Sequence, residues 1–371
     1  MNVDGLKLIK VTAIVKRSLS KALVQHLSSS GLTEWYMAPA RTIGLQEKRR
    51  GLGLIHFFKL IEELADIVIF FTDPSQENQA LELVIKNGEL TFPGRGSVFT
   101  EEVTLISPHE YRYGSEIDYA LDHITRKPSS LVGLCCIVQR GEGNKVARVA
   151  LDMGSGVPAI SFGSGTGIRD KLGLLRVAIP SQKEIIHLAL NPHDSETVMR
   201  MMIQAGELDL PGKGFLFLYP IRKGVVDTRI TQGFRRHVAS VEQMIATLDE
   251  LKGDVGWRRR SDRQVLMVDS RFYLKNLADV ILICNEGTGK FFAKEAMKAG
   301  TSGATISRLK HYCPQDLKPK GMSSAREACN MCIPEGQLER VTRILEEAGV
   351  FEEAASGELL IRGSPSAYTY S

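Results

Sequence analysis

Apolar and polar residues follow a recurring order of patterns along the chain. Residues 8–15 alternate in polarity and are rich in β-branched side chains, which predicts a strand. Residues 21–27 carry apolar side chains at helical spacing, with Ser20 as the expected N-cap and Gly31 as the expected stop. A strand, a basic loop, a strand, a helix and a last strand are then expected at residues 33–39, 41–53, 67–71, 76–86 and 97–105. This order, βαββαβ, is that of a ferredoxin-like unit.

Two later stretches predict the same order of elements. In the first, we expect strands at 134–139, 159–162, 185–190 and 215–221, with helices at 144–153 and 195–204. In the second, we expect strands at 280–284, 304–308, 328–332 and 358–361, with helices at 290–299 and 335–348. The expected fold class is therefore α+β, built from three ferredoxin-like βαββαβ repeats.

The amino-acid sequence itself also repeats. Residues 74–96 match residues 192–214 without a gap, with eight identities in 23 positions. A third, more diverged copy is visible where the pattern of residues 141–150 reappears at 287–296. Repetition on this scale indicates several copies of one small unit, with candidate sites at the seams between copies. We therefore divide the chain into repeat one, a linker, repeat two, a helical insertion and a divergent repeat three, at residues 1–105, 106–130, 131–223, 224–276 and 277–371.

Composition narrows the function classes. The chain is 43% hydrophobic and 24% charged, which is ordinary for a globular protein. A formal net charge of +4 is too small to indicate a nucleic-acid partner, and we expect none. No run approaches the ~18 apolar residues of a membrane span, and residues 1–5 lack a signal-peptide pattern, so we expect a cytoplasmic protein. All six cysteines lie in repeats two and three, where we expect reduced, buried thiols.

The unit resembles the PII nitrogen-regulatory superfamily in its order of elements, its long loop after the second strand and its Gly-x-Gly turn before the fourth. Repeat two is the most similar, through Cys136-Ile-Val-Gln-Arg-Gly141, Gly163-Ser-Gly-Thr-Gly167 and Leu210-Pro-Gly-Lys-Gly214. The resemblance covers about three quarters of the chain, and it rests on order, spacing and triplication together rather than on one motif. Because PII proteins are homotrimers, it implies a single-chain pseudotrimer, with three sheets facing a common axis. We expect such a chain to be a monomer or a dimer.

The resemblance also implies a ligand site. In the family, a nucleotide, usually adenine-based, lies between neighbouring subunits. One subunit provides the base of the long loop and the Gly-x-Gly turn, and the next provides basic C-terminal residues. Glycines allow backbone N–H groups to approach phosphate oxygens, and a cation adds a charge-assisted contact. Carried over by position, the ligand-binding residues are Arg41, Thr42, Gly94, Arg95, Gly96, Gly165, Thr166, Gly212, Lys213, Gly214, Arg222 and Lys223.

This sequence departs from the family pattern in ways that limit the expected sites. The lysine that follows the second glycine in classical PII is replaced by Ser97 or Phe215, and the cation lies between the glycines instead. Repeat three has Ala355-Ser-Gly357, without a cation. We therefore expect at most two competent clefts, in which replacing Arg95 or Lys213 by alanine weakens ligand binding.

Metal and catalytic chemistry have weaker signals. Cys329-Asn-Met-Cys332 has zinc-like spacing, with His311 and Cys313 as further candidate ligands. On a strand, however, residues three apart point to opposite faces, which favours core thiols, so we assign no metal. No Ser/His/Asp set or carboxylate pair is visible, so we assign no catalytic residue, no cofactor and no enzyme activity.

Two classes of function remain open. The first is a PII-like signalling protein that binds a small effector, an adenine nucleotide by resemblance, and controls a target enzyme or membrane transporter through its long loops. The alternative is a constitutive protein-interaction scaffold with no ligand. An enzyme that uses a pocket between repeats is a third reading, and it would need an acid–base pair that the sequence does not display.

Overall fold

The computed structural model describes residues 5–50, 55–108, 129–167, 181–232 and 273–370. The protein is a mixed α/β structure with one large, mostly antiparallel sheet. Among the described residues, no helix is long and apolar enough to cross a membrane. The linker 106–130 lies largely outside the described residues, and so does the helical insertion predicted at 224–276.

The order strand–helix–strand–strand–helix–strand occurs three times among the described elements. The first unit comprises β1 (Leu6–Lys16), α1 (Arg17–Ser29), β2 (Trp35–Arg50), β3 (Ile55–Thr72), α2 (Glu77–Asn87) and β4 (Gly96–Ile106). The second comprises β5 (Ser129–Gln139), α3 (Gly143–Asp152), β6 (Ala159–Thr166), β7 (Gln182–Leu190), α6 (Ser195–Gly206) and β8 (Gly214–Val225). The third comprises β10 (Leu277–Asn285), α9 (Gly289–Lys298), β11 (Ala304–Tyr312), β12 (Ala325–Pro334), α10 (Leu338–Glu347) and β13 (Glu358–Ser364). Short 3-10 turns, η1 (Pro74–Gln76) and η2 (Glu335–Gln337), precede α2 and α10, and the short strands β9 (Thr231–Gln232) and β14 (Ala367–Thr369) follow β8 and β13.

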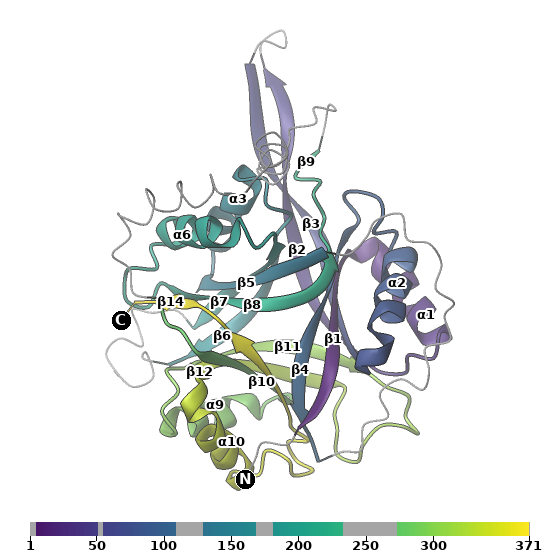
Figure 1. The fold of residues 1–371 in the computed structure, drawn as a ribbon, viewed down its shortest axis with the longest axis vertical. Coiled ribbons are helices and arrows are strands. Elements are labelled where there is room, and N and C mark those ends of the chain that lie inside the picture. Colours follow the sequence, from purple (N-terminus) through teal and green to yellow (C-terminus); the bar gives the residue numbers. More distant parts are fainter. Residues whose placement is uncertain (1–4, 51–54, 109–128, 168–180, 233–272, 371) are drawn as a thin grey trace, which may run out of the picture.

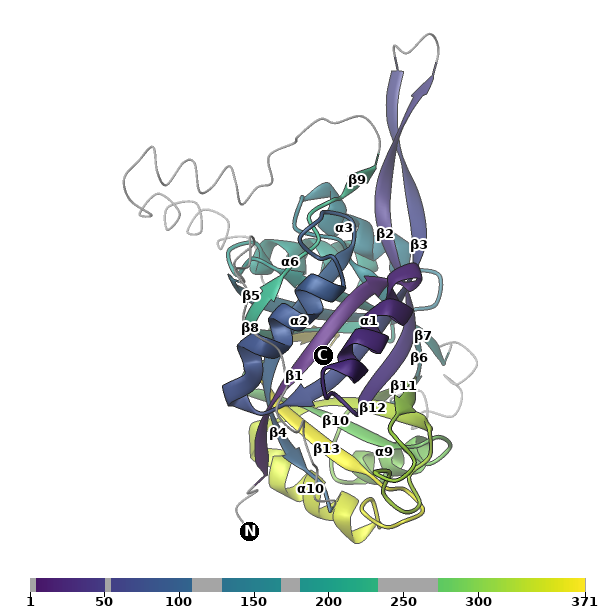
Figure 2. The same ribbon diagram turned by 90° about the vertical axis from the view of Figure 1, so that its right-hand side faces the viewer.

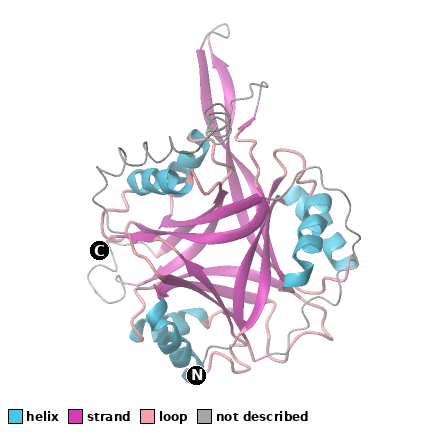
Figure 3. Ribbon diagram, viewed as in Figure 1, coloured by secondary structure: helices cyan, strands magenta, loops and turns pink. Residues whose placement is uncertain are grey.

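Each unit pairs its four strands in the same spatial order, with the fourth beside the first, the third next and the second last. The units are then joined edge to edge by antiparallel pairs such as β13–β4, β4–β8 and β6–β11. Figures 1 and 3 show the result: the strands surround a common centre, and the three helix pairs lie on the outside. Side chains from all three units therefore meet in one central cluster, which includes Phe99, Tyr219 and Ile281. Three further apolar clusters lie between the strands and each helix pair.

In each unit, an acidic residue on the third strand binds the beginning of the first helix. In the second unit, the Glu184 carboxylate accepts hydrogen bonds from the backbone N–H groups of Gly141 and Gly143, at 3.0 and 2.7 Å. In the third, the Glu327 carboxylate accepts one from Gly289, at 2.9 Å. A Cβ on Gly143 would lie 2.6 Å from the Glu184 carboxylate. Helix capping therefore explains the second glycine of Gly-x-Gly in both units, whereas the first, Gly141 or Gly287, has a positive φ of 96° or 93° that favours glycine.

Two predictions in the first unit are wrong. Residues 41–50 of the basic stretch are not a loop, because β2 and β3 pair in register from Tyr36 opposite Ile69 to Arg50 opposite Ile55; residues 51–53 lie outside the described residues. The outer part of this hairpin, residues 46–50 and 55–59, which we call the arm, projects beyond the rest of the molecule (Figures 1 and 2). Ile43 and Leu45 at its base are buried, but Lys48, Phe58 and Lys59 further out are exposed, and polarity does not signal a strand where no face is buried.

The first helix also begins earlier than its predicted cap. It starts at Arg17, and Ser20 lies within it. The Ser20 hydroxyl donates a hydrogen bond to the Asp66 carboxylate at 2.7 Å, and Arg17 pairs with the same carboxylate at 3.0 Å. Ser20 therefore anchors the helix to β3 rather than capping its N-terminus.

Candidate functional site

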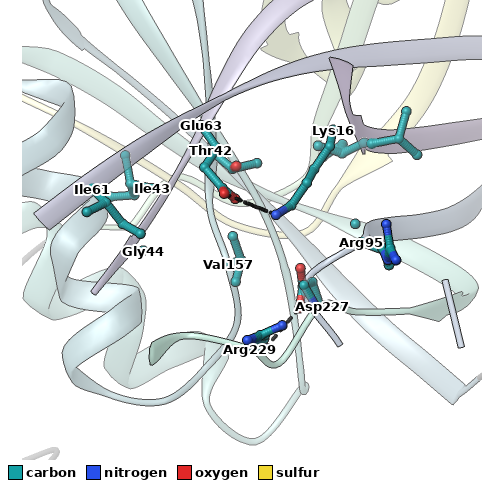
Figure 4. Close-up of a pocket in the computed structure, with 14 residues that line it drawn as sticks. Lys16, Thr42, Ile43, Gly44, Ile61, Glu63, Arg95, Val157, Asp227 and Arg229 are labelled. Atoms are coloured by element: carbon teal, nitrogen blue, oxygen red, sulfur yellow. Dashed lines mark hydrogen bonds and ion pairs between the residues drawn. The ribbon is translucent and has the colours of Figure 1, made fainter. Parts of the chain in front are cut away.

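A cleft lies at the seam between the first and second units (Figure 4). The first unit contributes the end of β1, the bases of β2 and β3, and the loop before β4, while the second unit contributes the segment after β8. The space open to a water molecule is only about 20 Å³, so the cleft is narrow in this state. It is lined by Ile14, Val15, Lys16, Thr42, Ile43, Gly44, Ile61, Glu63, Gly94, Arg95, Gly96, Val157, Asp227 and Arg229.

A carboxylate already occupies the anion-binding position of the glycine loop. The Asp227 carboxylate accepts a hydrogen bond from the backbone N–H of Gly94 at 2.8 Å and another from the N–H of Arg229 at 2.9 Å. The Asp227 backbone N–H donates to the Ser97 hydroxyl at 2.8 Å, which fixes the segment against the first unit. Asp227 is 6% exposed. The second unit therefore supplies the negative charge that the Gly94 loop binds.

Three cations line the same cleft. Lys16 pairs with Glu63 across the cleft at 2.8 Å, as Figure 4 shows, and Arg95 pairs with Glu89 at 3.2 Å. The Arg229 side chain lies over Gly94, where a Cβ would come within 2.8 Å of its Cδ. Among the described residues, the Arg229 guanidinium has no ion-pair partner. The cleft thus combines a backbone donor with cations from both units.

The segment that carries Asp227 also contacts the arm. The backbone N–H of Leu45 donates to the carbonyl of Ile230 at 2.8 Å, and β9 then pairs in parallel with β2. The N–H of Val157 donates to the carbonyl of Asp227 at 3.1 Å. Residues 227–232 therefore connect the Gly94 loop to the base of the arm.

Backbone packing requires the second glycine of the Gly-x-Gly turns in the first and second units. A Cβ on Gly96 would lie 2.1 Å from the carbonyl oxygen of Ile14, and one on Gly214 would lie 2.3 Å from that of Ile137. These glycines let the start of the fourth strand approach the first strand closely. Their recurrence in the sequence therefore does not by itself indicate a ligand.

The corresponding residues of the second unit contact other protein groups. Gly165 and Thr166 pair with Thr305 and Ala304 in the β6–β11 ladder.

In the loop before β8, Lys213 pairs with Glu207 at 2.7 Å, which raises the pKa of this lysine. Gly212 accepts a hydrogen bond at its carbonyl from the Gln139 amide at 3.2 Å, and Gly214 accepts one from the Thr369 hydroxyl at 3.4 Å.

The remaining predicted residues point away from the first cleft. Arg41 crosses to the second unit, where it pairs with Glu184 at 2.9 Å, so it neutralises the carboxylate that caps α3. Arg222 and Lys223 both pair with Glu77 of α2, at 3.1 and 3.3 Å. The cation that faces the Gly94 loop is instead Arg229. It follows β8, in the segment predicted as the insertion, and was not among the predicted ligand-binding residues.

The equivalent place in the third unit is filled by a buried arginine. Arg326 is fully buried and donates to the carbonyls of Ser356 and Ile283, at 2.7 and 3.3 Å. It also donates to the Asn285 side chain at 2.7 Å and lies 3.5 Å from the Glu358 carboxylate. The third loop is therefore occupied by protein groups.

A second constellation, absent from the sequence-based predictions, lies at the centre of the molecule. Lys10 and Arg362 both contact the Glu101 carboxylate, at 2.9 and 2.5 Å, and Arg362 also contacts Asp279 at 2.7 Å. The Arg362 guanidinium stacks on the ring of Tyr219, 3.6 Å from its centroid. Strands of all three units line a cavity here, in which about 100 Å³ is accessible to water. Two cations and two carboxylates thus share one buried site.

Burial and these neighbours shift the pKa values of the cluster. Burial favours a raised pKa for Glu101, but Arg362 and Lys10 outweigh it and hold the pKa below its ordinary value. Burial lowers the pKa of Lys10 and raises that of Asp279. His187 lines the same cavity, and burial together with the nearby cations lowers its pKa to about 4. The sequence contains a signal for this charged cluster, since Lys10 and Asp279 are charged residues within otherwise apolar strands.

The two thiols of the Cys-x-x-Cys pair lie on opposite faces of β12, as predicted. Cys329 belongs to the cluster under α9 and α10, whereas Cys332 packs against the central cluster. They cannot bind one metal ion together.

Comparisons with known proteins gave matches only among solved structures; no protein-family model and no curated protein matches the chain. The chain is similar to GlnK of B. subtilis in complex with ATP, at 18% identity and a TM-score of 0.24, over 27% of this chain and 88% of that chain. A second B. subtilis GlnK structure matches at 18% identity and a TM-score of 0.23, over 30% and 95%. Aspartate kinase from Synechocystis matches at 10% identity and a TM-score of 0.23, over 96% of this chain and 43% of that chain. At TM-scores this low, we base no conclusion about fold or function on these matches.

Proposed function

We propose that the chain is a PII-like signalling protein in which three ferredoxin-like units form a single-chain pseudotrimer. It binds an adenine nucleotide in the cleft between the first and second units and controls a target enzyme or membrane transporter through the arm. The observation that carries this proposal is the Asp227 carboxylate on the Gly94 N–H, in a cleft that Lys16, Arg95 and Arg229 also line. A phosphate group has the charge and the acceptor oxygens to take the place of that carboxylate.

Ligand binding in this proposal is an exchange of anions. A phosphate on the Gly94 N–H displaces the Asp227 carboxylate, and residues 227–232 leave the narrow cleft with it. Because the backbone N–H of Leu45, at the base of the arm, is hydrogen-bonded to the carbonyl of Ile230, the exchange also removes a contact that holds the base of the arm. The ligand then shifts the protein between two states because it binds the displaced state better.

Replacing Asp227 by alanine tests this exchange. We expect the affinity for ATP to rise by about tenfold or more, because the ligand no longer competes with a charged hydrogen-bond acceptor. Isothermal titration of the full chain with ATP measures the effect. Asp152→Ala is a matched control, since Asp152 is an exposed carboxylate that, within the described part of the chain, pairs along its own helix with Arg148, at 3.3 Å. Unchanged or weaker binding in Asp227→Ala would contradict the role of this carboxylate.

The identity of the effector is tested by thermal unfolding of the chain with ATP, ADP, AMP, cyclic nucleotides, S-adenosylmethionine and bicarbonate. A ligand at 100 times its Kd adds about 2.7 kcal/mol to the free energy of unfolding, which gives a clear shift in Tm. We expect the shift with ATP or ADP. A shift with bicarbonate alone would overturn the assignment to an adenine nucleotide.

The second candidate is a constitutive interaction scaffold. It is favoured by protein groups that already form hydrogen bonds with the loop before the fourth strand in two of the units. Asp227 accepts one from the Gly94 N–H, and Arg326 donates one to the Ser356 carbonyl. In a scaffold, the Asp227 contact is a permanent part of the seam. No compound then changes the melting temperature, and the arm binds its target whether or not a metabolite is present.

A further inference from the structure

Three side chains with metal-binding atoms meet at the seam between the first and third units. The donor atoms of Glu34, His311 and Cys313 all lie within 4.8 Å of one another. The His311 Nε2 is 2.6 Å from a Glu34 carboxylate oxygen. Glu34 precedes β2, whereas the other two residues lie at the end of β11. The seam therefore brings together an oxygen, a nitrogen and a sulfur from two units.

Strand register explains why these three residues share a face. In the antiparallel β11–β2 pair, His311 is opposite Tyr36 and Tyr312 is opposite Trp35. Continuing the same register by one residue places Glu34 opposite Cys313. Because side chains alternate along a strand, His311 and Cys313 lie on the same face, with Glu34 across from them.

Aromatic packing holds this arrangement from both faces. Tyr312 stacks on Trp35 on the opposite face, with ring centroids 5.6 Å apart and planes inclined by 15°. Tyr36 stacks on the His311 ring at 4.7 Å and 20°, which fixes the direction of its nitrogens. The His311 side chain is fully buried, and its Nδ1 has no hydrogen-bond partner among the described residues. Cys313 is only partly buried, which leaves a route from solvent.

From this geometry we propose that Glu34, His311 and Cys313 bind a zinc ion. Zinc takes carboxylate oxygen, imidazole nitrogen and thiolate sulfur as ligands in tetrahedral sites. Three protein ligands leave a fourth position for a water molecule. The ion joins the start of β2 to the end of β11, so it fastens the first unit to the third. This site is independent of the nucleotide cleft, which uses other residues of the first unit.

The test uses the full chain after treatment with a chelator. Cobalt(II) serves as a spectroscopic probe, because a cobalt–thiolate bond gives a charge-transfer band, and zinc affinity is measured by competition with a chromogenic chelator. We expect one equivalent of metal, a thiolate band that zinc abolishes, and zinc binding at least about tenfold weaker in Cys313→Ser and in Glu34→Gln. Thermal unfolding without metal shows that both variants fold.

Cys332→Ser is the matched control, because Cys332 is another partly buried thiol of the third unit that lies outside the cluster. The band and the affinity are expected to persist in this variant. Absence of the band in the wild-type chain, its persistence in Cys313→Ser, or unchanged zinc affinity in Glu34→Gln would each overturn the proposal.

Discussion

Replacing Arg362 by methionine is expected to lower the free energy of unfolding by about 3–5 kcal/mol, because it leaves buried carboxylates without their main partner. Arg362 contacts both Glu101 and Asp279 and is 7% exposed. Methionine retains most of the apolar volume, so the loss reports on charge rather than on a cavity. Lys10 remains in the variant, but it contacts only Glu101 at salt-bridge distance. Chemical denaturation at neutral pH measures the change.

Arg308→Met is the control for this prediction. Arg308 also forms an ion pair, with Glu286 at 2.9 Å, but its side chain is 83% exposed. Exposed pairs of this kind contribute up to about 1 kcal/mol. Equal losses in the two variants would mean that the central cluster does not carry the stability assigned to it.

Acid is expected to destabilise the wild-type chain more than a His187→Gln variant. The folded-state pKa of His187 is about 4, below its ordinary value of 6.5. As the pH falls from 6.5 towards 4, the unfolded chain gains a proton at this position and the folded chain does not. Stability due to the neutral ring is therefore present above pH 6.5 and lost as the pH falls through this interval. The full shift corresponds to about 3 kcal/mol, which we take as an upper value.

The measurement is denaturant unfolding of both proteins across that pH interval. Glutamine can keep a hydrogen bond to Ser161, which His187 contacts at 2.9 Å, but it does not titrate. The groups that influence the His187 ring, Lys10, Arg362 and Glu101, are present in both proteins, so their own effects largely cancel in the comparison. Parallel stability curves for the two proteins would show that His187 is not held neutral by burial.

The order of elements was predictable from the sequence because it depends on local patterns. Residues 8–15, for example, alternate in polarity and form part of β1. The glycine loop at Gly94 was also predictable, since turn glycines leave a local signal. These features need no knowledge of what lies across the chain.

The features that the sequence did not predict depend on contacts between residues far apart in the chain. Asp227 and Arg229 lie in a segment without a repeat counterpart, and only the fold brings them to Gly94. The basic stretch was predicted to be a loop because exposed residues such as Lys48 leave no alternation between a buried and an exposed face. Glu34 and His311 are 277 positions apart, so their contact had no sequence spacing to reveal it.

The central claim is that the first cleft binds a nucleotide through the glycine loop and its cations. The most direct measurement is calorimetric titration of ATP into the wild-type chain, Arg95→Ala and Lys213→Ala. Arg95 lines the first cleft, whereas Lys213 is the corresponding cation of the second unit and pairs with Glu207. We predict binding in the wild-type chain and at least about tenfold weaker binding in Arg95→Ala. In contrast to the expectation from sequence, we predict little change in Lys213→Ala, because Lys213 does not line this cleft. No binding in the wild-type chain, or equal affinity in Arg95→Ala, would contradict the claim and favour the scaffold.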